Sequence, residues 1–264
     1  MTESLKGWAV ILGASSGFGG SAAVNLARAG MDIVGVHLDR KGTLPNAERI
    51  KSEIEGMGRK ALFFNINASD AGKRQGVIDE LKKQENGEGP PVRVLFHSLA
   101  FGTLRPYVSK DPGDTISKAQ MEMTIDVMAN SLVYWVQDLV HLGLMGKGSR
   151  VFSMTSAGSS RIWPFYGAVS AAKAALESHT RQLAVEMGPM GITANCLRAG
   201  VTDTPSLRKI PGHEEMIDWV KEKNPGGRLT TPDDVAAVLI SLCQEGTEWC
   251  SGNVIGVDGG EYLV

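Results

Sequence analysis

The stretch "WAVILGASSGFGG", residues 8–20, decides the fold. An apolar run of five residues is followed by a turn with Gly13, Gly17 and Gly19, and then by the helix-like residues 21–29. Glycines there allow a tight turn and a close approach of the backbone to a pyrophosphate, which would use the free N–H groups at the start of the helix. This order predicts a dinucleotide site, with a plain tight turn as the alternative.

Short β-branched runs and helix-like stretches alternate along the rest of the chain. The runs are 32–36, 61–66, 92–97, 150–154, 192–197 and 253–257, and the longer helix-like stretches are 47–57, 119–145 and 168–187. Alternation implies parallel strands with right-handed crossovers, and nearly continuous apolar runs imply strands covered on both faces. The predicted fold is α/β: a Rossmann-type doubly wound parallel sheet of about seven strands with helices on both faces.

Length and composition favour one domain over residues 1–264. The chain has 264 residues, 42% of them hydrophobic, which is enough for one large core. The candidate linkers "ENGEGPP" (85–91) and "SKDPGD" (109–114) are short and are interpreted as loops.

Several classes of partner are not favoured. A net charge of -2 gives no electrostatic reason to expect nucleic acid or an anionic membrane. No apolar span of 18 residues exists and the start "MTESLKGW" does not resemble a signal peptide, so we expect a cytoplasmic protein. The three cysteines and five histidines fit no metal or redox spacing, and we expect no bound metal.

The segment "FYGAVSAAK", residues 165–173, places Tyr166 and Lys173 seven residues apart. On a helix this spacing puts both side chains on one face, roughly 10 Å apart along the axis. A packed ring with a snorkelling amine is the structural alternative.

Taken together, the glycine turn, "HSLAFG" after the fourth strand, the Tyr/Lys segment and "NVIGVDGG" resemble the short-chain dehydrogenase/reductase family over nearly the whole chain. Leu12 stands where the family usually has threonine. The resemblance implies a single-domain nucleotide-binding fold, usually a homotetramer. It also implies that Tyr166 is the catalytic acid, and that Lys173 holds the nicotinamide ribose and lowers the pKa of the tyrosine.

Most of the family spaces its tyrosine and lysine by four, where this chain has Ser170. A spacing of seven resembles the enoyl-acyl carrier protein reductases of fatty-acid synthesis. Two other departures agree with that subgroup: Ala199 in "RAGVTDT" replaces the usual proline, and Met128 in "IDVMAN" replaces the usual catalytic asparagine.

A physical argument supports the subgroup. A carbonyl reductase delivers hydride to the carbon of the C=O that its tyrosine protonates. An enoyl reductase delivers hydride to the β-carbon of a thioester, while charge develops on an oxygen several bonds away. A donor must lie within about 3 Å of that charge, so a tyrosine one turn farther from Lys173 suits conjugate reduction.

The predicted function is therefore an enoyl-thioester reductase that transfers hydride from NAD(P)H to the β-carbon of a trans-2-enoyl thioester. We expect the acyl group to be carried by acyl carrier protein, with coenzyme A as the alternative carrier. One alternative is a 3-oxoacyl or other carbonyl reductase, because "GASSGFG" resembles that group. A remote alternative is a non-catalytic nucleotide-binding sensor, which need not keep Tyr166 and Lys173.

A serine is expected to assist the tyrosine. Ser156 lies ten residues before Tyr166, where a divergent branch of enoyl reductases with a similar glycine loop has serine. Ser153, at the spacing of the family's usual catalytic serine, is the competitor, and a simple turn serine at the strand end is the structural alternative for Ser156.

The choice between NADH and NADPH depends on the residues at the end of the second strand. An acidic residue there binds the ribose diol and repels a 2′-phosphate, and His37 occupies that position. Arg40 and Lys41 follow and favour NADPH, whereas Asp39 could bind the diol of NADH.

The resemblance implies a set of cofactor contacts at the glycine turn and at the ends of the second, third, fourth and sixth strands. They are Gly13, Ser15, Ser16, Gly17, Phe18, Gly19, His37, Arg40, Asn65, Ile66, Ser98, Leu99, Ala100, Lys173, Gly200, Val201, Thr202 and Thr204.

The resemblance implies that residues 204–228 form the loop that covers the substrate, and their mixture of apolar anchors with charge fits a mobile lid. An ordinary amphipathic surface helix is the structural alternative. The anchors are Leu207, Ile210, Met216, Ile217 and Trp219, and the basic residues Arg208 and Lys209 are candidates for contact with an acidic carrier protein.

Overall fold

The computed structural model describes residues 4–84 and 91–264. Its seven strands form one parallel sheet in the order β3-β2-β1-β4-β5-β6-β7. The strands are β1 (Trp8–Leu12), β2 (Asp32–His37), β3 (Ala61–Asn65), β4 (Val92–His97), β5 (Arg150–Ser156), β6 (Thr193–Ala199) and β7 (Val254–Val257). The predicted doubly wound α/β sheet of about seven strands is confirmed.

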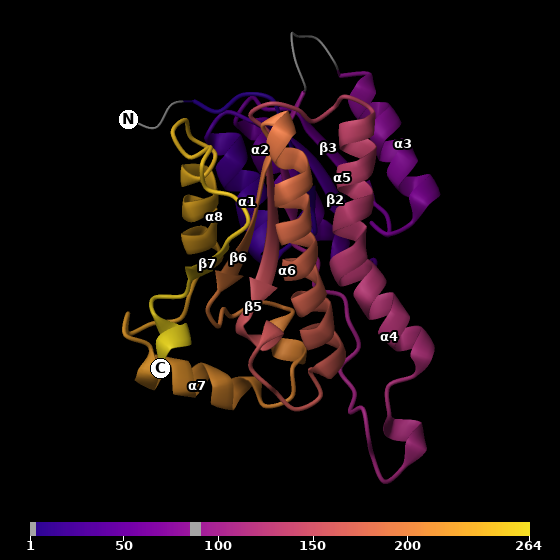
Figure 1. Ribbon diagram of the computed structural model, residues 1–264, viewed down its shortest axis with the longest axis vertical. Helices are drawn as coiled ribbons and strands as arrows, with labels where there is room; N and C mark the ends of the chain where they lie inside the picture. The colour runs from indigo at the N-terminus through magenta and orange to yellow at the C-terminus, as the bar shows by residue number, and fades with distance from the viewer. Residues whose placement is uncertain (1–3, 85–90) are drawn as a thin grey trace.

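Helices cover both faces of the sheet (Figure 1). They are α1 (Gly17–Arg28), α2 (Leu44–Gly56), α3 (Ala71–Lys82), α4 (Lys118–Ile125), α5 (Ser131–His141), α6 (Gly167–Met187), α7 (His213–Lys223) and α8 (Pro232–Ser241). Helices α3, α5 and α6 pack on one face, and α1, α2 and α8 on the other. The candidate linker 85–91 lies outside the described residues except for Pro91, and the candidate loop 109–114 ends in a short 3-10 turn, Pro112–Asp114.

Strand β1 shows why its sequence is apolar at every position. All five residues are buried. Val10 and Leu12 pack into the cluster beneath α3, α5 and α6, whereas Ala9 and Ile11 pack into the cluster beneath α1, α2 and α8. Because side chains alternate between the two faces of a strand, only a strand covered on both faces requires this pattern.

The single helix expected over 119–145 is wrong in two respects. A π-helical segment, Asp126–Asn130, separates α4 from α5, and α5 ends at His141. A π turn inserts one extra residue into a helix and is frequent at functional sites. Gly143, with φ +71, then takes the left-handed conformation that commonly follows a helix end.

All carboxyl ends of the strands meet at one edge of the sheet, because every strand is parallel. In Figure 1 this is the end of the molecule where α7 and the C-terminus lie. From β1 the chain adds β2 and β3 on one side, and then β4 to β7 on the other side of β1, so the strand order switches between β1 and β4. Ligands of doubly wound folds bind in the crevice at such a switch point.

Candidate active site

The glycine turn between β1 and α1 leaves bare backbone at the carboxyl edge. Gly13 has φ +96, and a Cβ atom there would collide with the Ser98 carbonyl oxygen. A Cβ atom on Gly19 would collide with the Gly13 carbonyl oxygen. Helix α1 starts at Gly17, and its cap residue Ser16 makes no side-chain bond to the free N–H groups. These features fit a pyrophosphate, which needs close backbone and unpaired donors.

The carboxylate of Asp39, two residues after the end of β2, lies next to this glycine turn. His37 is buried, and its Nδ1 lies 2.9 Å from Asp39 Oδ2. The Asn65 side chain exchanges hydrogen bonds of 2.9 and 3.0 Å with the backbone of Asp39. Burial acts to raise the pKa of Asp39, but hydrogen bonds from Thr43, Ser15 and His37 outweigh it and hold the pKa below its usual value. The carboxylate is therefore charged and fixed in place.

Arg40, the residue expected to read a 2′-phosphate, is exposed. Within residues 4–84 and 91–264 its side chain has no hydrogen bond or ion pair that would fix it. The charged group held beside the glycine turn is instead that of Asp39, so this placement gives NADH more support than NADPH.

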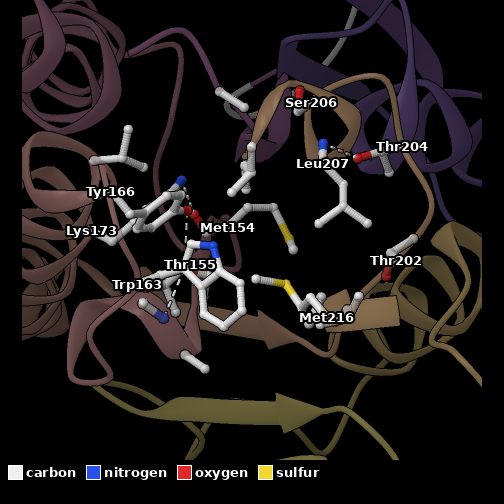
Figure 2. A pocket seen from close by; sticks show the side chains of 18 of the residues that line it. Met154, Thr155, Trp163, Tyr166, Lys173, Thr202, Thr204, Ser206, Leu207 and Met216 are labelled. Carbon is white, nitrogen blue, oxygen red and sulfur yellow. Dashed lines mark hydrogen bonds between the residues drawn. The ribbon is translucent and has the colours of Figure 1, made fainter. Parts of the chain in front are cut away.

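The catalytic candidates lie at the start of α6. Tyr166 is the cap residue of the helix, and Phe165 before it has φ +65. Lys173 is buried, and its Nζ donates to the carbonyl oxygen of Met154 at 2.7 Å and to that of Leu99 at 3.4 Å (Figure 2). Burial lowers the pKa of Lys173 to about 8. Tyr166 and Lys173 line one cavity.

The effect of Lys173 on the pKa of Tyr166 stays a prediction. Burial raises the pKa of Tyr166, and the group that opposes this is the hydroxyl of Ser156, 3.5 Å from the tyrosine oxygen. The Lys173 ammonium donates to the carbonyl oxygens of Met154 and Leu99. Tyr166 therefore stays protonated near neutral pH and can donate a hydrogen bond.

Ser156 and Ser153 have different surroundings. Ser156 lies at the end of β5 and lines the cavity with Tyr166. Ser153 is fully buried, and its hydroxyl contacts Thr180 Oγ1 at 2.9 Å and Cys196 Sγ at 3.1 Å. Only Ser156 of the two competitors contacts the tyrosine.

The cavity has a volume of about 650 Å³ and a largely apolar lining. Tyr166 and Lys173 lie on one side, with Met216, Leu207 and Thr204 across from them (Figure 2). The apolar lining residues larger than alanine are Phe18, Leu99, Leu104, Met128, Met154, Ile162, Trp163, Val169, Val201, Leu207, Ile210, Met216, Trp219 and Val220. Such a lining binds an apolar group, and few polar groups orient it.

The segment 204–228 forms part of the cavity wall. It contains a 3-10 turn, Leu207–Lys209, and helix α7. Four of its five predicted anchors line the cavity; Ile217 does not. Trp163 Nε1 donates to the Pro211 carbonyl oxygen at 3.1 Å and joins the segment to the loop before Tyr166. Arg208 is paired with Asp203 at 2.8 Å, whereas Lys209 lines the cavity.

The predicted cofactor contacts fall into two groups. Those that line the large cavity are Phe18, Ser98, Leu99, Ala100, Lys173, Gly200, Val201, Thr202 and Thr204. Gly13, Ser15, Ser16, Gly17, Gly19, His37, Arg40, Asn65 and Ile66 lie outside it, at the glycine turn and the ends of β2 and β3. Thr204 joins the two groups, because its Cγ2 lies 3.6 Å from the Cβ position of Gly17.

Sequence reasoning missed several residues of the site. Thr155, Arg161, Trp163 and Glu261 line the cavity, and Glu261 accepts a hydrogen bond from the Val201 N–H at 2.9 Å. The alternation of β5 offered a weak signal for Thr155, whereas the return of Glu261 to the end of β6 depends on the tertiary fold.

Two negative findings concern only the part of the chain that the structure describes. There, no helix has both the length and the apolarity needed to cross a membrane. Nor do three or more His, Cys, Asp or Glu side chains gather in a way that would hold a metal ion.

The parallel sheet, the glycine turn after β1 and the Tyr/Lys pair on α6 define a dinucleotide-dependent oxidoreductase of the short-chain dehydrogenase/reductase class. The chain belongs to the family described as "Enoyl-(Acyl carrier protein) reductase", whose model matches residues 13–261. It is an NAD(P)-dependent oxidoreductase.

Individual relatives differ in their activities. The chain is 30% identical to an "NADPH-dependent aldehyde reductase-like protein, chloroplastic" of Arabidopsis thaliana, over 96% of this chain and 93% of that protein. It is 26% identical to an "Enoyl-[acyl-carrier-protein] reductase [NADH]" of Aquifex aeolicus, over 71% and 68% of the two chains. A solved enoyl-(acyl-carrier-protein) reductase of Anaplasma phagocytophilum in complex with NAD has the same fold, with a TM-score of 0.81, 21% identity and coverage of 98% and 92%.

Proposed function

We propose that the protein is an enoyl-thioester reductase, which reduces the C=C bond of a trans-2-enoyl thioester. The observation that carries the proposal is the seven-residue spacing of Tyr166 and Lys173 on one wall of a largely apolar cavity. NAD(P)H, when bound, supplies the hydride. The glycine turn and the start of α1 would hold its pyrophosphate, the end of β2 its adenosine ribose, and Lys173 its nicotinamide ribose.

Tyr166 and Ser156 would stabilise the charge that develops on the thioester oxygen. Their hydroxyl oxygens are 3.5 Å apart, and both line the cavity. Because burial raises the pKa of Tyr166, the phenol keeps its proton and donates to an enolate oxygen. A hydrogen bond donated by Ser156 to the tyrosine oxygen would polarise the phenol further.

The apolar cluster of Met128, Val169 and Ala172 beside this pair, called the cavity floor below, is evidence for an acyl substrate. Met128, on the π segment, packs with Val169 and Ala172, and Leu104 and Tyr166 contact the same cluster. Where most of the family has a polar asparagine, this chain therefore has a thioether among apolar side chains. An acyl chain beside the reacting carbons would meet apolar surface there.

A carbonyl reductase is the second candidate. It is favoured by the loop "GASSGFG" and by the similarity to the Arabidopsis aldehyde reductase-like protein. A non-catalytic nucleotide sensor has less support, because it would not require the buried Lys173 or the contact between Tyr166 and Ser156.

Steady-state oxidation of NADH and NADPH with crotonyl and acetoacetyl thioesters, side by side, tests the proposal. We expect turnover of the crotonyl thioester and little of the acetoacetyl thioester. Turnover of the 3-oxoacyl compound alone would contradict the proposal and favour the second candidate. Presenting each acyl group on acyl carrier protein and on coenzyme A in parallel distinguishes the two carriers.

Acyl carrier protein as carrier, assembly as a homotetramer and a cytoplasmic location also belong to this proposal. The positive charge of Lys209 at the cavity wall favours an acidic carrier protein, whereas the charge of Arg208 is already paired with Asp203. Sedimentation of the purified protein measures the number of subunits.

A further inference from the structure

Two successive residues at the end of β5 each hold a side chain of α6. The carbonyl oxygen of Met154 accepts from Lys173 Nζ at 2.7 Å, and Thr155 Oγ1 donates to Glu177 Oε1 at 2.6 Å. Glu177 follows Lys173 by four residues, which places it one turn farther along the same face of the helix. The Glu177 carboxylate is thus fixed between α6 and β5, beside the carbonyl that holds the lysine and outside the cavity lining.

The other ionisable groups that face Lys173 are neutral near pH 7. Burial, together with the charge of Lys173, lowers the pKa of His97 on β4 to about 3. Burial raises the pKa of the Cys196 thiol on β6 and that of the Tyr166 phenol on α6. Among the described residues that face this amine, Glu177 therefore supplies the negative charge.

A second cation lies nearby and is already engaged. Arg198 stands opposite Thr155 in the ladder between β5 and β6. Its guanidinium lies 3.7 Å from Asp258 Oδ2 and 3.5 Å from the ring centroid of Tyr262. This leaves Glu177 to act on Lys173.

Lys173 needs such a partner because it is buried. Burial lowers the pKa of Lys173 to about 8, and Cys196 and Glu177 oppose that effect. Since the buried thiol is uncharged near neutral pH, the persistent opposing charge is the carboxylate.

We propose that Glu177 is a positioning residue that keeps Lys173 charged and in place, and that Thr155 fixes the Glu177 carboxylate for this role. In this scheme Glu177 lies outside the cavity lining, and Thr155 acts through its hydrogen bond to the Glu177 carboxylate. Both act through the lysine that would hold the nicotinamide ribose.

The test is the pH dependence of NADH and NADPH binding, measured by nicotinamide fluorescence between pH 6 and 10. In the unchanged protein, affinity should fall as pH rises through about 8, because the ammonium loses its proton. Glu177→Gln keeps an oxygen for the Thr155 hydrogen bond but removes the charge. The fall in affinity should then begin about one pH unit lower, as expected for the loss of one nearby charge. Glu186→Gln, which removes an exposed carboxylate farther along α6, is the matched control and should leave the curve unchanged.

Thr155 provides a second, independent variant. Thr155→Val removes the hydroxyl that fixes the carboxylate and should shift the curve in the same direction by a smaller amount. Thr155→Ser restores a hydroxyl and should restore the curve. A merely structural role would lower the melting temperature without moving the curve.

Lys173→Ala identifies the titrating group, because it should abolish the fall in affinity with pH, and adding Glu177→Gln to it should change nothing further. A folded Glu177→Gln protein with an unchanged curve would overturn the inference, as would a Lys173→Ala protein that retains the fall. If Glu177→Gln does not fold, the Thr155→Val curve decides in the same way. The readout is cofactor binding, so it distinguishes failure of this inference from failure of the enoyl-reductase proposal, which turnover measures.

Discussion

The cofactor preference is the prediction that the structure changes most, and it depends on Asp39. Its side chain is 11% exposed, and Asp39 Oδ2 lies 2.9 Å from His37 Nδ1. The carboxylate also has a hydrogen bond with Ser15 of the glycine turn. A 2′-phosphate bound at the end of β2 would place a second negative group near it. We therefore expect NADH to be the better donor, and Asp39→Asn to reduce that preference.

The magnitude follows from Coulomb's law. Two unit charges about 6 Å apart at an effective dielectric constant of about 20 repel by roughly 3 kcal/mol, and salt screens part of this at a partly exposed site. Each 1.4 kcal/mol corresponds to about a tenfold change in affinity. Asp39→Asn, which keeps the shape of the side chain, should therefore shift the ratio of the two KM values at least about tenfold toward NADPH.

The assay is the KM for NADH and NADPH at a fixed concentration of the acyl substrate, in low and moderate salt. Glu55→Gln removes a carboxylate from the surface of α2 and controls for net charge alone. The reasoning would be refuted if Asp39→Asn left the ratio unchanged while Arg40→Ala raised the KM for NADPH tenfold. Arg40 would then read the phosphate, as its place after the second strand suggests.

The remaining predictions concern the catalytic wall and the glycine turn. Tyr166→Phe should lower kcat by about 10²- to 10⁴-fold with little change in cofactor binding, whereas Lys173→Ala should weaken cofactor binding and slow turnover together; kcat and cofactor Kd distinguish them. Ser156→Ala should lower kcat less than Tyr166→Phe, and equal losses would argue against a supporting role. Gly19→Ala should abolish cofactor binding, measured by fluorescence, because its methyl group would collide with the turn. Met128→Asn should lower the melting temperature, because it buries a polar amide among apolar side chains at a cost of about 1–3 kcal/mol, and it should raise the KM of longer acyl chains; an unchanged KM would separate the cavity floor from the acyl site.

The strands were largely predictable from the sequence because a doubly covered sheet leaves an apolar run with few interruptions. The first run, residues 8–12, matches β1 at both ends. Helix α3 was less visible: Gly72 and Gly76 weaken its helical pattern, although Asp70 caps it by accepting from the Lys73 N–H at 2.9 Å. The break between α4 and α5 was not predictable, because a π turn has no composition signal of its own.

At the site, spacing within one element was informative and contacts between elements were not. The pairing of Tyr166 and Lys173 follows from helix geometry alone. The choice between Ser153 and Ser156 depends on which face of β5 lies against Cys196 and which end reaches the cavity. The orientation of Asp39 depends on Asn65, a residue 26 positions away that only the pairing of β2 with β3 brings near.

Two departures from the usual family pattern and the serine beside Tyr166 support one another chemically. Tyr166 stands one turn farther from Lys173, Met128 replaces a polar side chain on the cavity floor, and Ser156 places a hydroxyl next to the tyrosine oxygen. Together they move the tyrosine hydroxyl away from Lys173, surround Met128 with apolar side chains and place the Ser156 hydroxyl beside the tyrosine oxygen. A carbonyl reductase needs its donor next to the atom that receives hydride, whereas a conjugate reduction needs it several bonds away. If the site selected C=O bonds, these changes would work against the reaction at every position; for a C=C bond they place the hydrogen-bond donors where the negative charge develops.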